Sequence, residues 1–526
     1  MKAFLILFIG FIGFVSGFSQ IWKTYPYTPP GSLISFPVDE GRHVNEPVEW
    51  WYTSGHLTGI NTGKHYSFML AYFHFPVGNI DGFRILNFSD DDSQIFHSES
   101  KILTYNMLAT DKLEIEAQIQ GGSLETWKNK YNAGQMLAFQ YELSAVSEQV
   151  QLDLDYDTFK RPLILGDDGY LLQAATNYTY YYSQTGIDIT GTITYNGMTE
   201  PVSGMGWIDR QYGDMNPYYG VEYEWFSIQL SNGMDLNLWN IFENNQIPDD
   251  ERYKILAAYV DDDTQYTTAE FQLERLSYDY TPDLQRCYAQ SWHLTSAVND
   301  VDLTISTLYS DSEVQVPFRF YEGSTVITGT VNGQAVTGQG FAELLHSYQN
   351  PQVSIDNNTA WNINIPLQWH VVNPDDGNPL VYTLAYSTDQ NTYQPIAEGL
   401  TGTQYLWNNT SLADGDVFWI KLTAQSVDGT LTGTDIKEFH YDSTASMDLS
   451  RITAVNIYPN PGSEYVIIQA ENIKKIEIVD NNGRIIFSQP VHNATQVRLN
   501  TDTLRGIYLI KIYTGKATYI RKYIAG

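Results

Sequence analysis

The sequence predicts an all-β protein that is divided into several domains. Its 526 residues exceed what a single hydrophobic core normally serves, so separate folding units are expected. Tyrosine is abundant, at 39 residues, and turn-forming Gly and Asn recur between short segments of alternating polarity. No stretch keeps a helical spacing of apolar residues over a useful length. Strands joined by tight turns therefore account for the predicted fold.

Residues 1–19 have the pattern of a secretory signal peptide. Lys2 is followed by an uncharged apolar run from Ala3 to Val15, and small residues precede a cleavage site expected after Ser19. The run is shorter than the roughly 20 residues that a membrane-spanning helix requires, which favours a removed signal over an anchor. No later stretch is apolar enough to cross a membrane, so we expect a mature chain without a transmembrane segment.

Residues 30–215 and 216–348 read as two successive units of antiparallel strands. Within Val326–Leu344, the dipeptide Asn332-Gly333 separates two β-branched runs, which is the strongest short-range signal for a hairpin. The segment Gly191–Gly197 shows the same alternation beside a turn. So many short strands predict two barrels or sandwiches in tandem.

Residues 351–442 have a different character and resemble a fibronectin type III domain. Trp369, Tyr382 and Trp419 are spaced as inward-facing residues of a sandwich core would be. Because that fold has no inherent chemistry, we expect a spacer or adhesion module here.

Residues 447–526 form the last unit, after a linker rich in Ser, Thr and Asp at Asp442–Asp448. From Ser446 onward, ten Lys or Arg face six Asp or Glu, a balance of +4 in a chain of net charge −32. The unit resembles the C-terminal sorting domain of the type IX secretion system, through its turn Pro459–Pro461, its hairpin Asp480–Arg484 and the strand Gly506–Ile512. The resemblance implies type IX machinery as a partner, and a location on the cell surface or outside the cell.

The charge and the cysteine content exclude several classes of site. The chain before Ser446 carries −36, and a surface this acidic repels phosphate backbones, so no nucleic-acid partner is expected. Cys287 is the single cysteine, which excludes an internal disulfide and a cysteine-rich zinc site. We expect its thiol to be buried as a small apolar group.

Chemistry-bearing residues gather in four segments, Glu46–Leu57, Gly204–Gly213, Tyr223–Trp239 and Phe320–Ser347. Strand alternation places adjacent Trp50 and Trp51 on opposite faces, and it separates Asp209 from Arg210 in the same way. Trp207 shares a face with Asp209, and Trp225 shares one with Ser227 and Gln229. Glu322 lies beside an aromatic pair, and Glu343 lies in an otherwise apolar strand.

The order of these motifs, from Phe36 to Ser347, resembles the carotenoid 1,2-hydratase and AttH-like family of lipocalin-like proteins, often labelled predicted secreted hydrolases. The resemblance implies two lipocalin-like barrels side by side and a hydratase activity. One departure concerns Gln211 and Tyr212, where the family usually has an acidic residue and Trp. The residues on motif positions are His43, Glu49, Trp50, Trp207, Asp209, Arg210, Trp225 and Glu322.

Hydration of an isolated alkene requires a proton donor and surroundings that tolerate a carbocation. A carboxyl group buried among aromatic rings keeps its proton near neutral pH, and the ring faces stabilise a cation. The candidate acids are Asp209 and Glu322, with His43 positioning the water. No metal or organic cofactor is expected. The candidate ligand-binding residues are Trp50, Glu49, Trp207, Arg210, Trp225 and Tyr321.

Alternatives remain open for both residues and function. Asp209 and Arg210 could form an ion pair that closes a barrel end, and the acidic runs at 90–92 and 261–263 read as solvated turns rather than calcium sites. One function is a cofactor-free enzyme that hydrates or isomerises a hydrophobic alkene-bearing molecule, held in a barrel or between barrels. The alternatives are a non-catalytic carrier of a lipophilic ligand and a surface adhesion protein.

Overall fold

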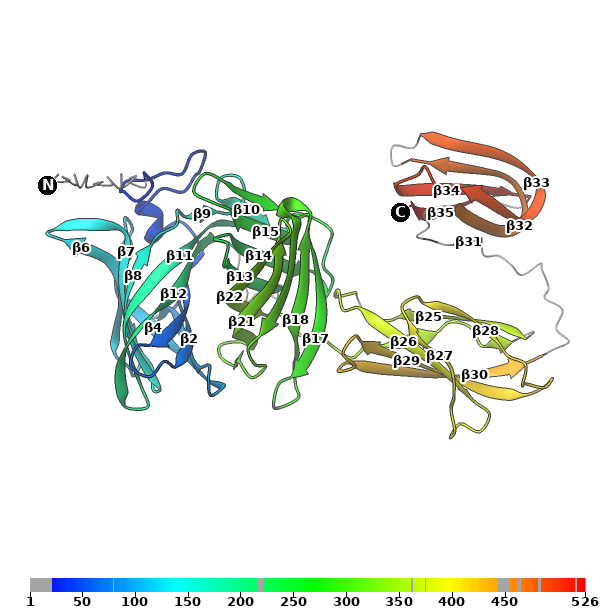
Figure 1. Cartoon of the computed structure of the whole chain (residues 1–526), viewed down its shortest axis with the longest axis horizontal. Helices are drawn as coiled ribbons and strands as arrows, with labels where there is room; N and C mark the ends of the chain where they lie inside the picture. Colours follow the sequence, from blue (N-terminus) through cyan, green and yellow to red (C-terminus); the bar gives the residue numbers. More distant parts are fainter. Residues whose placement is uncertain are drawn as a thin grey trace, which may run out of the picture.

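The structure is a computed structural model that describes residues 21–525, except for 79, 215–220, 361–362, 374, 443–454, 459, 461–464, 481–483 and 516–517. The expected signal peptide and most of the linker lie outside the described residues. The described secondary structure consists of strands and two short 3₁₀ turns, Val38–Glu40 and Val298–Asp300. The predicted all-β fold is confirmed, and Figure 1 shows its successive units along the chain.

The first unit is a closed antiparallel barrel. Neighbouring strands pair in sequence order from β1 to β8, β8 then pairs with β11, and β12 pairs with both β11 and β1 to close the sheet. Two short strands, β9 (Leu163–Ile164) and β10 (Tyr170–Gln173), add to β11. The barrel strands are β1 (Val48–Gly59), β2 (His65–Val77), β3 (Ile80–Asp90), β4 (Ile95–Leu108), β5 (Glu114–Ile119), β6 (Leu124–Asn132), β7 (Gln135–Val146), β8 (Val150–Thr158), β11 (Asn177–Tyr195) and β12 (Met198–Gly213).

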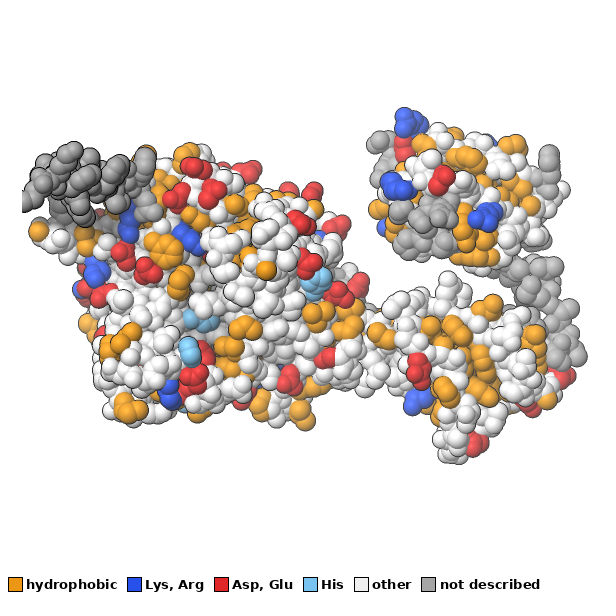
Figure 2. All heavy atoms as spheres, in the orientation of Figure 1, with side chains coloured by type: hydrophobic (Ala, Val, Ile, Leu, Met, Phe, Trp, Pro, Cys, Tyr) orange, Lys and Arg blue, Asp and Glu red, His pale blue; other side chains and the backbone are white. Residues whose placement is uncertain are grey.

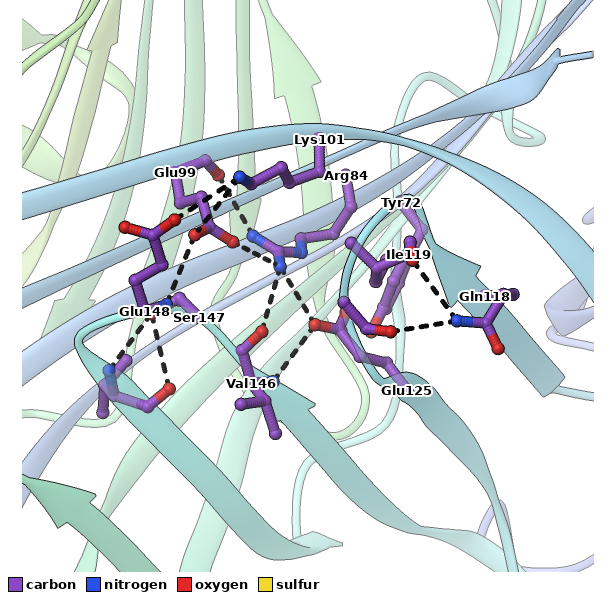
Figure 3. Close-up of polar contacts among 12 residues, drawn as sticks. Tyr72, Arg84, Glu99, Lys101, Gln118, Ile119, Glu125, Val146, Ser147 and Glu148 are labelled. Atoms are coloured by element: carbon purple, nitrogen blue, oxygen red, sulfur yellow. Dashed lines mark hydrogen bonds and ion pairs between the residues drawn. The ribbon is translucent and has the colours of Figure 1, made fainter.

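The interior of this barrel is packed with side chains and holds a buried charge network. The fully buried Arg84 Nη2 donates to Glu99 Oε1 at 2.9 Å and to Glu125 Oε1 at 3.0 Å, as Figure 3 shows. Tyr72 donates to the second oxygen of Glu125 at 2.7 Å. Because each charge has a partner, these groups are tolerated inside an apolar core. The first barrel interior is therefore a structural core.

The second unit is an antiparallel sheet that curls around its own core, seen in green in Figure 1. Its strands follow the order β16-β15-β14-β13-β22-β21-β19-β18-β17, and β20 (Glu313–Val314) pairs with β21. Among the described residues no ladder joins β16 to β17, so this barrel is incompletely closed. The strands are β13 (Glu222–Leu230), β14 (Asp235–Phe242), β15 (Lys254–Tyr259), β16 (Gln265–Thr268), β17 (Gln272–Tyr280), β18 (Cys287–Ser296), β19 (Val301–Thr307), β21 (Phe320–Val331) and β22 (Gln334–Leu344).

The two barrels are joined by a third apolar cluster, made from outward-facing side chains. Strand alternation puts Trp51 inside the first barrel and Tyr52 outside it, where Tyr52 packs with residues of the second barrel such as Trp225 and Phe341. Sheets that are apolar on both faces can pack against a second sheet while keeping their own cores. This interface positions the candidate site.

A β-sandwich follows the two barrels. Trp369 and Tyr382 face its core as predicted, but the same prediction for Trp419 is wrong. Alternation along its strand turns Phe418 and Ile420 inward instead, leaving Trp419 half-buried on the other face. One sheet contains β23 (Val353–Ile355), β25 (Asn364–Val371) and β28 (Gln404–Asn408), and the other contains β24 (Thr359–Ala360), β26 (Leu380–Ser387), β27 (Gln394–Leu400), β29 (Val417–Ser426) and β30 (Thr432–Tyr441).

The last unit has an apolar core of its own. Figure 2 shows several Lys and Arg side chains on it, whereas acidic side chains are spread over the two barrels. In the predicted turn, Asn460 accepts from the Ile524 backbone at 2.9 Å, while its two proline neighbours lie outside the described residues. Its strands are β31 (Asn456–Tyr458), β32 (Tyr465–Val479), β33 (Ile485–Asn500), β34 (Gly506–Thr514) and β35 (Thr518–Ala525).

Two further observations bear on compartment and chemistry. Among the described residues, no helix has the length and hydropathy that crossing a membrane would need.

Cys287 lies in the core of the second barrel, and burial raises the pKa of its thiol to about 12. That thiol is therefore a poor nucleophile at neutral pH.

Candidate functional site

A cavity of about 40 Å³ lies between the two barrels. The first barrel contributes Trp50, Tyr52 and Asp209 to its wall, and the second contributes Trp225, Trp239 and Glu343. The wall is thus mostly aromatic and carries two carboxyl groups. Apolar cavities with a few convergent polar groups are the usual form of small-molecule sites.

The site depends on the alternation of two adjacent strands. Tyr52 on β1 and Asp209 on β12 are cross-strand neighbours, and both side chains point outward to the cavity. The next pair, Trp51 and Arg210, points the opposite way, toward the barrel core. Alternation along these strands therefore places Asp209 on one face of the sheet and Arg210 on the other, so that the polar groups around each are separated by the thickness of the sheet.

Asp209 is buried and receives hydrogen bonds on both carboxyl oxygens. Its Oδ1 accepts from Ser183 Oγ at 2.5 Å and from Trp207 Nε1 at 2.7 Å, and its Oδ2 accepts from the Tyr181 hydroxyl at 2.5 Å. Burial raises the pKa of Asp209 to about 7, although these donors oppose the rise, and the charge of Glu343 adds to it. Asp209 can therefore exchange a proton near neutral pH.

The hydroxyl of Tyr181 has a defined direction. It accepts from Asn237 Nδ2 at 2.7 Å and from Trp225 Nε1 at 3.2 Å. With its acceptor positions taken, the hydroxyl hydrogen points to Asp209 Oδ2. Because the donors around Asp209 all offer hydrogens, the surroundings suit an ionised carboxylate, and Asp209 is built as a proton acceptor.

Glu322 and Glu343 form a carboxyl pair beside the cavity. They are directly opposite each other on β21 and β22, where Glu322 is buried and Glu343 is half-buried. The Tyr52 hydroxyl donates to Glu322 Oε1 at 3.0 Å, and the Tyr223 hydroxyl donates to Glu343 Oε1. Glu343 lies in the cavity wall, and Glu322 lies behind it.

The surroundings of this pair favour its protonated form. Burial raises the pKa of Glu322 well above its ordinary value, and the negative charge of Glu343 raises it further. Burial also raises the pKa of Glu343. Two neighbouring carboxyl groups in an apolar wall oppose each other's ionisation, which favours a proton shared between them. The pair can serve as the proton donor of the cavity.

A separate polar cluster lies on the other face of β1 and β12. Arg210 Nη2 donates to Glu49 Oε2 at 2.5 Å and to the Gly41 carbonyl at 2.6 Å, and its guanidinium lies 3.9 Å from the Trp51 ring. The His43 backbone also donates to Glu49, at 3.0 Å. Burial opposes ionisation of Glu49, but Arg210 and His43 leave its pKa lowered. The cluster clamps the chain before β1 to the barrel end.

The predicted site residues lie partly at the cavity and partly in the clamp. Trp50 and Trp225 line the cavity beside Asp209, and Trp207 supports Asp209 from behind. The suggested ion pair between Asp209 and Arg210 is wrong, because the two point to opposite faces and Arg210 pairs with Glu49. His43, Glu49 and Arg210 belong to the clamp, outside the cavity wall.

Tyr321 points into the core of the second barrel, away from its neighbour Glu322. Its hydroxyl donates to the Tyr309 carbonyl at 2.8 Å. The sequence interpretation did not assign Glu343, Tyr181, Tyr52 and Tyr223 to the site. One signal could have found Glu343, because a carboxylate in an otherwise apolar strand needs a buried partner. The acidic run at 261–263 is an exposed turn, as predicted, but the same prediction for 90–92 is wrong, because Asp90 is buried at the end of β3 and Asp91 is half-buried, accepting from Ser67 and Tyr309. No metal-binding cluster occurs in the described part of the chain.

Residues 27–348 match the AttH-like family, and residues 456–525 match the secretion-system C-terminal sorting domain. A curated relative, kievitone hydratase of Fusarium solani subsp. phaseoli, is 23% identical over 314 residues, which cover 56% of this chain and 82% of the relative. The structure of an AttH-like protein from Nitrosomonas europaea aligns with a TM-score of 0.51 at 20% identity, covering 60% of this chain and 98% of that one.

A kievitone hydratase structure from Nectria haematococca aligns with a TM-score of 0.49 at 16% identity, covering 61% of this chain and 98% of that one. The sorting domain indicates handling by the type IX secretion system and delivery to the cell surface or the extracellular space. The predictions of a lipocalin-like, hydratase-related fold and of this destination are confirmed.

Proposed function

The chain belongs to the AttH-like family, and from that premise we propose that it is a secreted hydratase acting on a hydrophobic alkene-bearing small molecule. The observation that carries the proposal is an aromatic cavity whose wall holds Asp209 and Glu343, with Glu322 paired to Glu343 behind the wall. The name of the relative kievitone hydratase supports water addition as the reaction class. The cavity between the barrels is the proposed reaction site.

In the first step, Glu343 delivers the proton that it shares with Glu322 to one alkene carbon. The π electron pair forms the new C–H bond, the Glu pair becomes fully ionised, and the neighbouring carbon becomes a cation. The faces of Trp50, Trp225 and Trp239 stabilise that cation through their quadrupoles. A tightly placed acid of this kind contributes roughly 10²–10⁴-fold to a rate.

In the second step, Asp209 accepts a proton from a water molecule as the water oxygen bonds to the cation. The product is the alcohol, and the sum is one alkene plus one water. Return of the proton from Asp209 to the Glu pair through solvent resets the site. Tyr181 and Ser183 hold the Asp209 carboxylate in place throughout.

A second candidate function is a carrier that binds the same class of molecule without changing it. The predominance of aromatic side chains in the cavity wall favours this reading independently of the carboxyl groups. The two functions differ in one observable, which is whether the bound molecule gains the elements of water.

The test uses the full secreted chain in water enriched in ¹⁸O, with kievitone and other apolar alkenes as substrates. Wild type is expected to release an alcohol that has gained one H₂¹⁸O by mass spectrometry. Glu343→Gln and Asp209→Asn should abolish that gain, while Glu274→Gln, an exposed Glu→Gln change in the second barrel, should retain it. Equal binding of unmodified alkene by wild type and all variants would replace the hydratase with the carrier.

A further inference from the structure

A second hollow, of about 390 Å³, lies beside the site on the outside of the barrel interface. The first barrel contributes Phe75, Phe83 and Ile102, and the second contributes Val316 and Pro317 from the segment between β20 and β21. Ile102 and Val316 are apolar and yet 37% and 62% exposed. We call this hollow the apolar groove.

The groove lies next to the cavity along the same strands. On β2, Phe73 lines the cavity, and Phe75, two residues on, lines the groove. On β3, Ile85 and Phe83 repeat that relationship. Residues two apart on a strand share a face and lie about 7 Å apart. The groove therefore begins one side chain beyond the cavity.

Aromatic side chains form the boundary between the two hollows. Phe73 and Phe83 stack with ring centroids 4.3 Å apart at an angle of 13°. From the other barrel, Phe318 lines the cavity while the preceding Pro317 lines the groove. A flat or extended hydrocarbon can pass along such ring faces at no polar desolvation cost.

The segment that covers the groove is held in place at its base. Arg319 donates to Glu313 Oε2 at 2.5 Å and to Asp283 Oδ2 at 2.9 Å. These charge-assisted bonds fix the chain next to Val316 and Phe318, so the groove is preformed. A preformed apolar groove beside a reaction cavity binds an apolar group without the cost of ordering its walls.

We propose that the apolar groove binds a hydrocarbon arm of the substrate, which places the alkene between Asp209 and Glu343. The substrate class is then an amphiphile or lipid-like molecule with an extended apolar arm, rather than a compact polar alkene. This inference rests on the proposed function for the position of the alkene. The binding of the arm itself requires no catalysis.

The experiment measures binding to the full chain through fluorescence of the cavity tryptophans, using unbranched ω-unsaturated alcohols of increasing length. Once the chain is long enough to enter the groove, each added methylene should raise the affinity of wild type about fourfold. The double variant Ile102→Asp with Val316→Asp should bind short alcohols as wild type does and lose that gain for long ones. Leu284→Asp, which changes an exposed apolar residue of the second barrel outside the groove, is the matched control.

A gain with chain length that is equal in wild type and the double variant would overturn the proposal, as would absence of binding by every alcohol. Measuring both binding and hydration of the same alcohols, by wild type and by Glu343→Gln, separates this proposal from the proposed function. If affinity rises with chain length but neither protein hydrates an alcohol, the groove is supported and the hydratase is overturned. If wild type hydrates the alcohols but its affinity does not depend on their length, the hydratase is supported and the groove is overturned.

Discussion

Glu322 and Glu343 face each other across the β21–β22 hairpin, at the edge of an aromatic cavity. Their phenolic partners come from different barrels, Tyr52 from the first and Tyr223 from the second. The environment that raises the pKa of the pair therefore depends on the packing of the two barrels. A protein that separated its barrels would expose the pair and lose the shared proton.

The stability of the barrel pair should decrease as pH rises above about 4.5, the ordinary pKa of a glutamic acid. The folded-state pKa of Glu322 is raised, so the folded chain holds a proton that the unfolded chain releases. Chemical denaturation followed by tryptophan fluorescence between acidic and neutral pH would show this slope. Glu322→Gln should flatten it, because the glutamine carries no titrating proton. An unchanged slope in that variant would contradict a protonated pair.

The hydration rate should rise with pH through about 7, the pKa of Asp209, and fall again when the Glu pair loses its proton at higher pH. The rise reports the ionised base and the fall reports the acid. Asp209→Asn should lower kcat by roughly 10²–10⁴-fold above pH 7, where wild-type Asp209 is ionised, and by less at lower pH. A rate that instead falls through pH 7 would exchange the two roles and make Asp209 the acid.

Tyr181→Phe should move the rising limb of that pH profile to higher pH. The variant removes the hydroxyl that donates to Asp209 Oδ2 at 2.5 Å, and a carboxylate that loses a donor has a higher pKa. The rate on the alkaline side of the limb should be reduced less than in Asp209→Asn. Tyr321→Phe, which removes a buried hydroxyl bonded away from the cavity, should leave the limb in place. Equal shifts in both variants would indicate general damage to the fold.

The sequence contained more of this site than its motifs suggested. The turn at Asn332-Gly333 pairs Val331 with Gln334, and counting outward along the two strands brings Glu322 opposite Glu343. The hairpin signal alone was therefore enough to predict a carboxyl pair. The opposite faces of Trp50 and Trp51 also followed from alternation.

Other features could not be predicted from local patterns. Tyr181 and Ser183 come from β11, which carries no distinctive motif, and they reach Asp209 because β11 pairs with β12 in the first barrel. Asn237 comes from the second barrel, and it meets Tyr181 only because the two barrels pack against each other. Adjacency in the motif also suggested an ion pair between Asp209 and Arg210, but the two side chains belong to different clusters. Adjacent residues of a strand motif point to opposite faces of the sheet, so they lie in two different environments.

The clamp of Arg210 and Glu49 should act on stability and leave the chemistry intact. Both side chains are buried, and removing one partner leaves an uncompensated charge, which typically costs about 3–5 kcal/mol. Glu49→Gln should therefore lower the midpoint of urea unfolding while retaining hydration per folded molecule. The pKa of Glu49 is lowered in the folded state, so the loss should be largest above about pH 4.5 and shrink as pH falls.

The paired variant Glu49→Leu with Arg210→Met distinguishes the effect of an unpaired buried charge from the effect of lost side-chain packing. Replacing both members by apolar groups of similar size removes the buried charge and should recover most of the stability lost in Glu49→Gln. If the paired variant is stable but no longer hydrates substrate, the clamp contributes directly to catalysis. If it is stable and active, the motif that carries His43, Glu49 and Arg210 marks the architecture of the barrel end, and the reaction belongs to the other face of the same two strands.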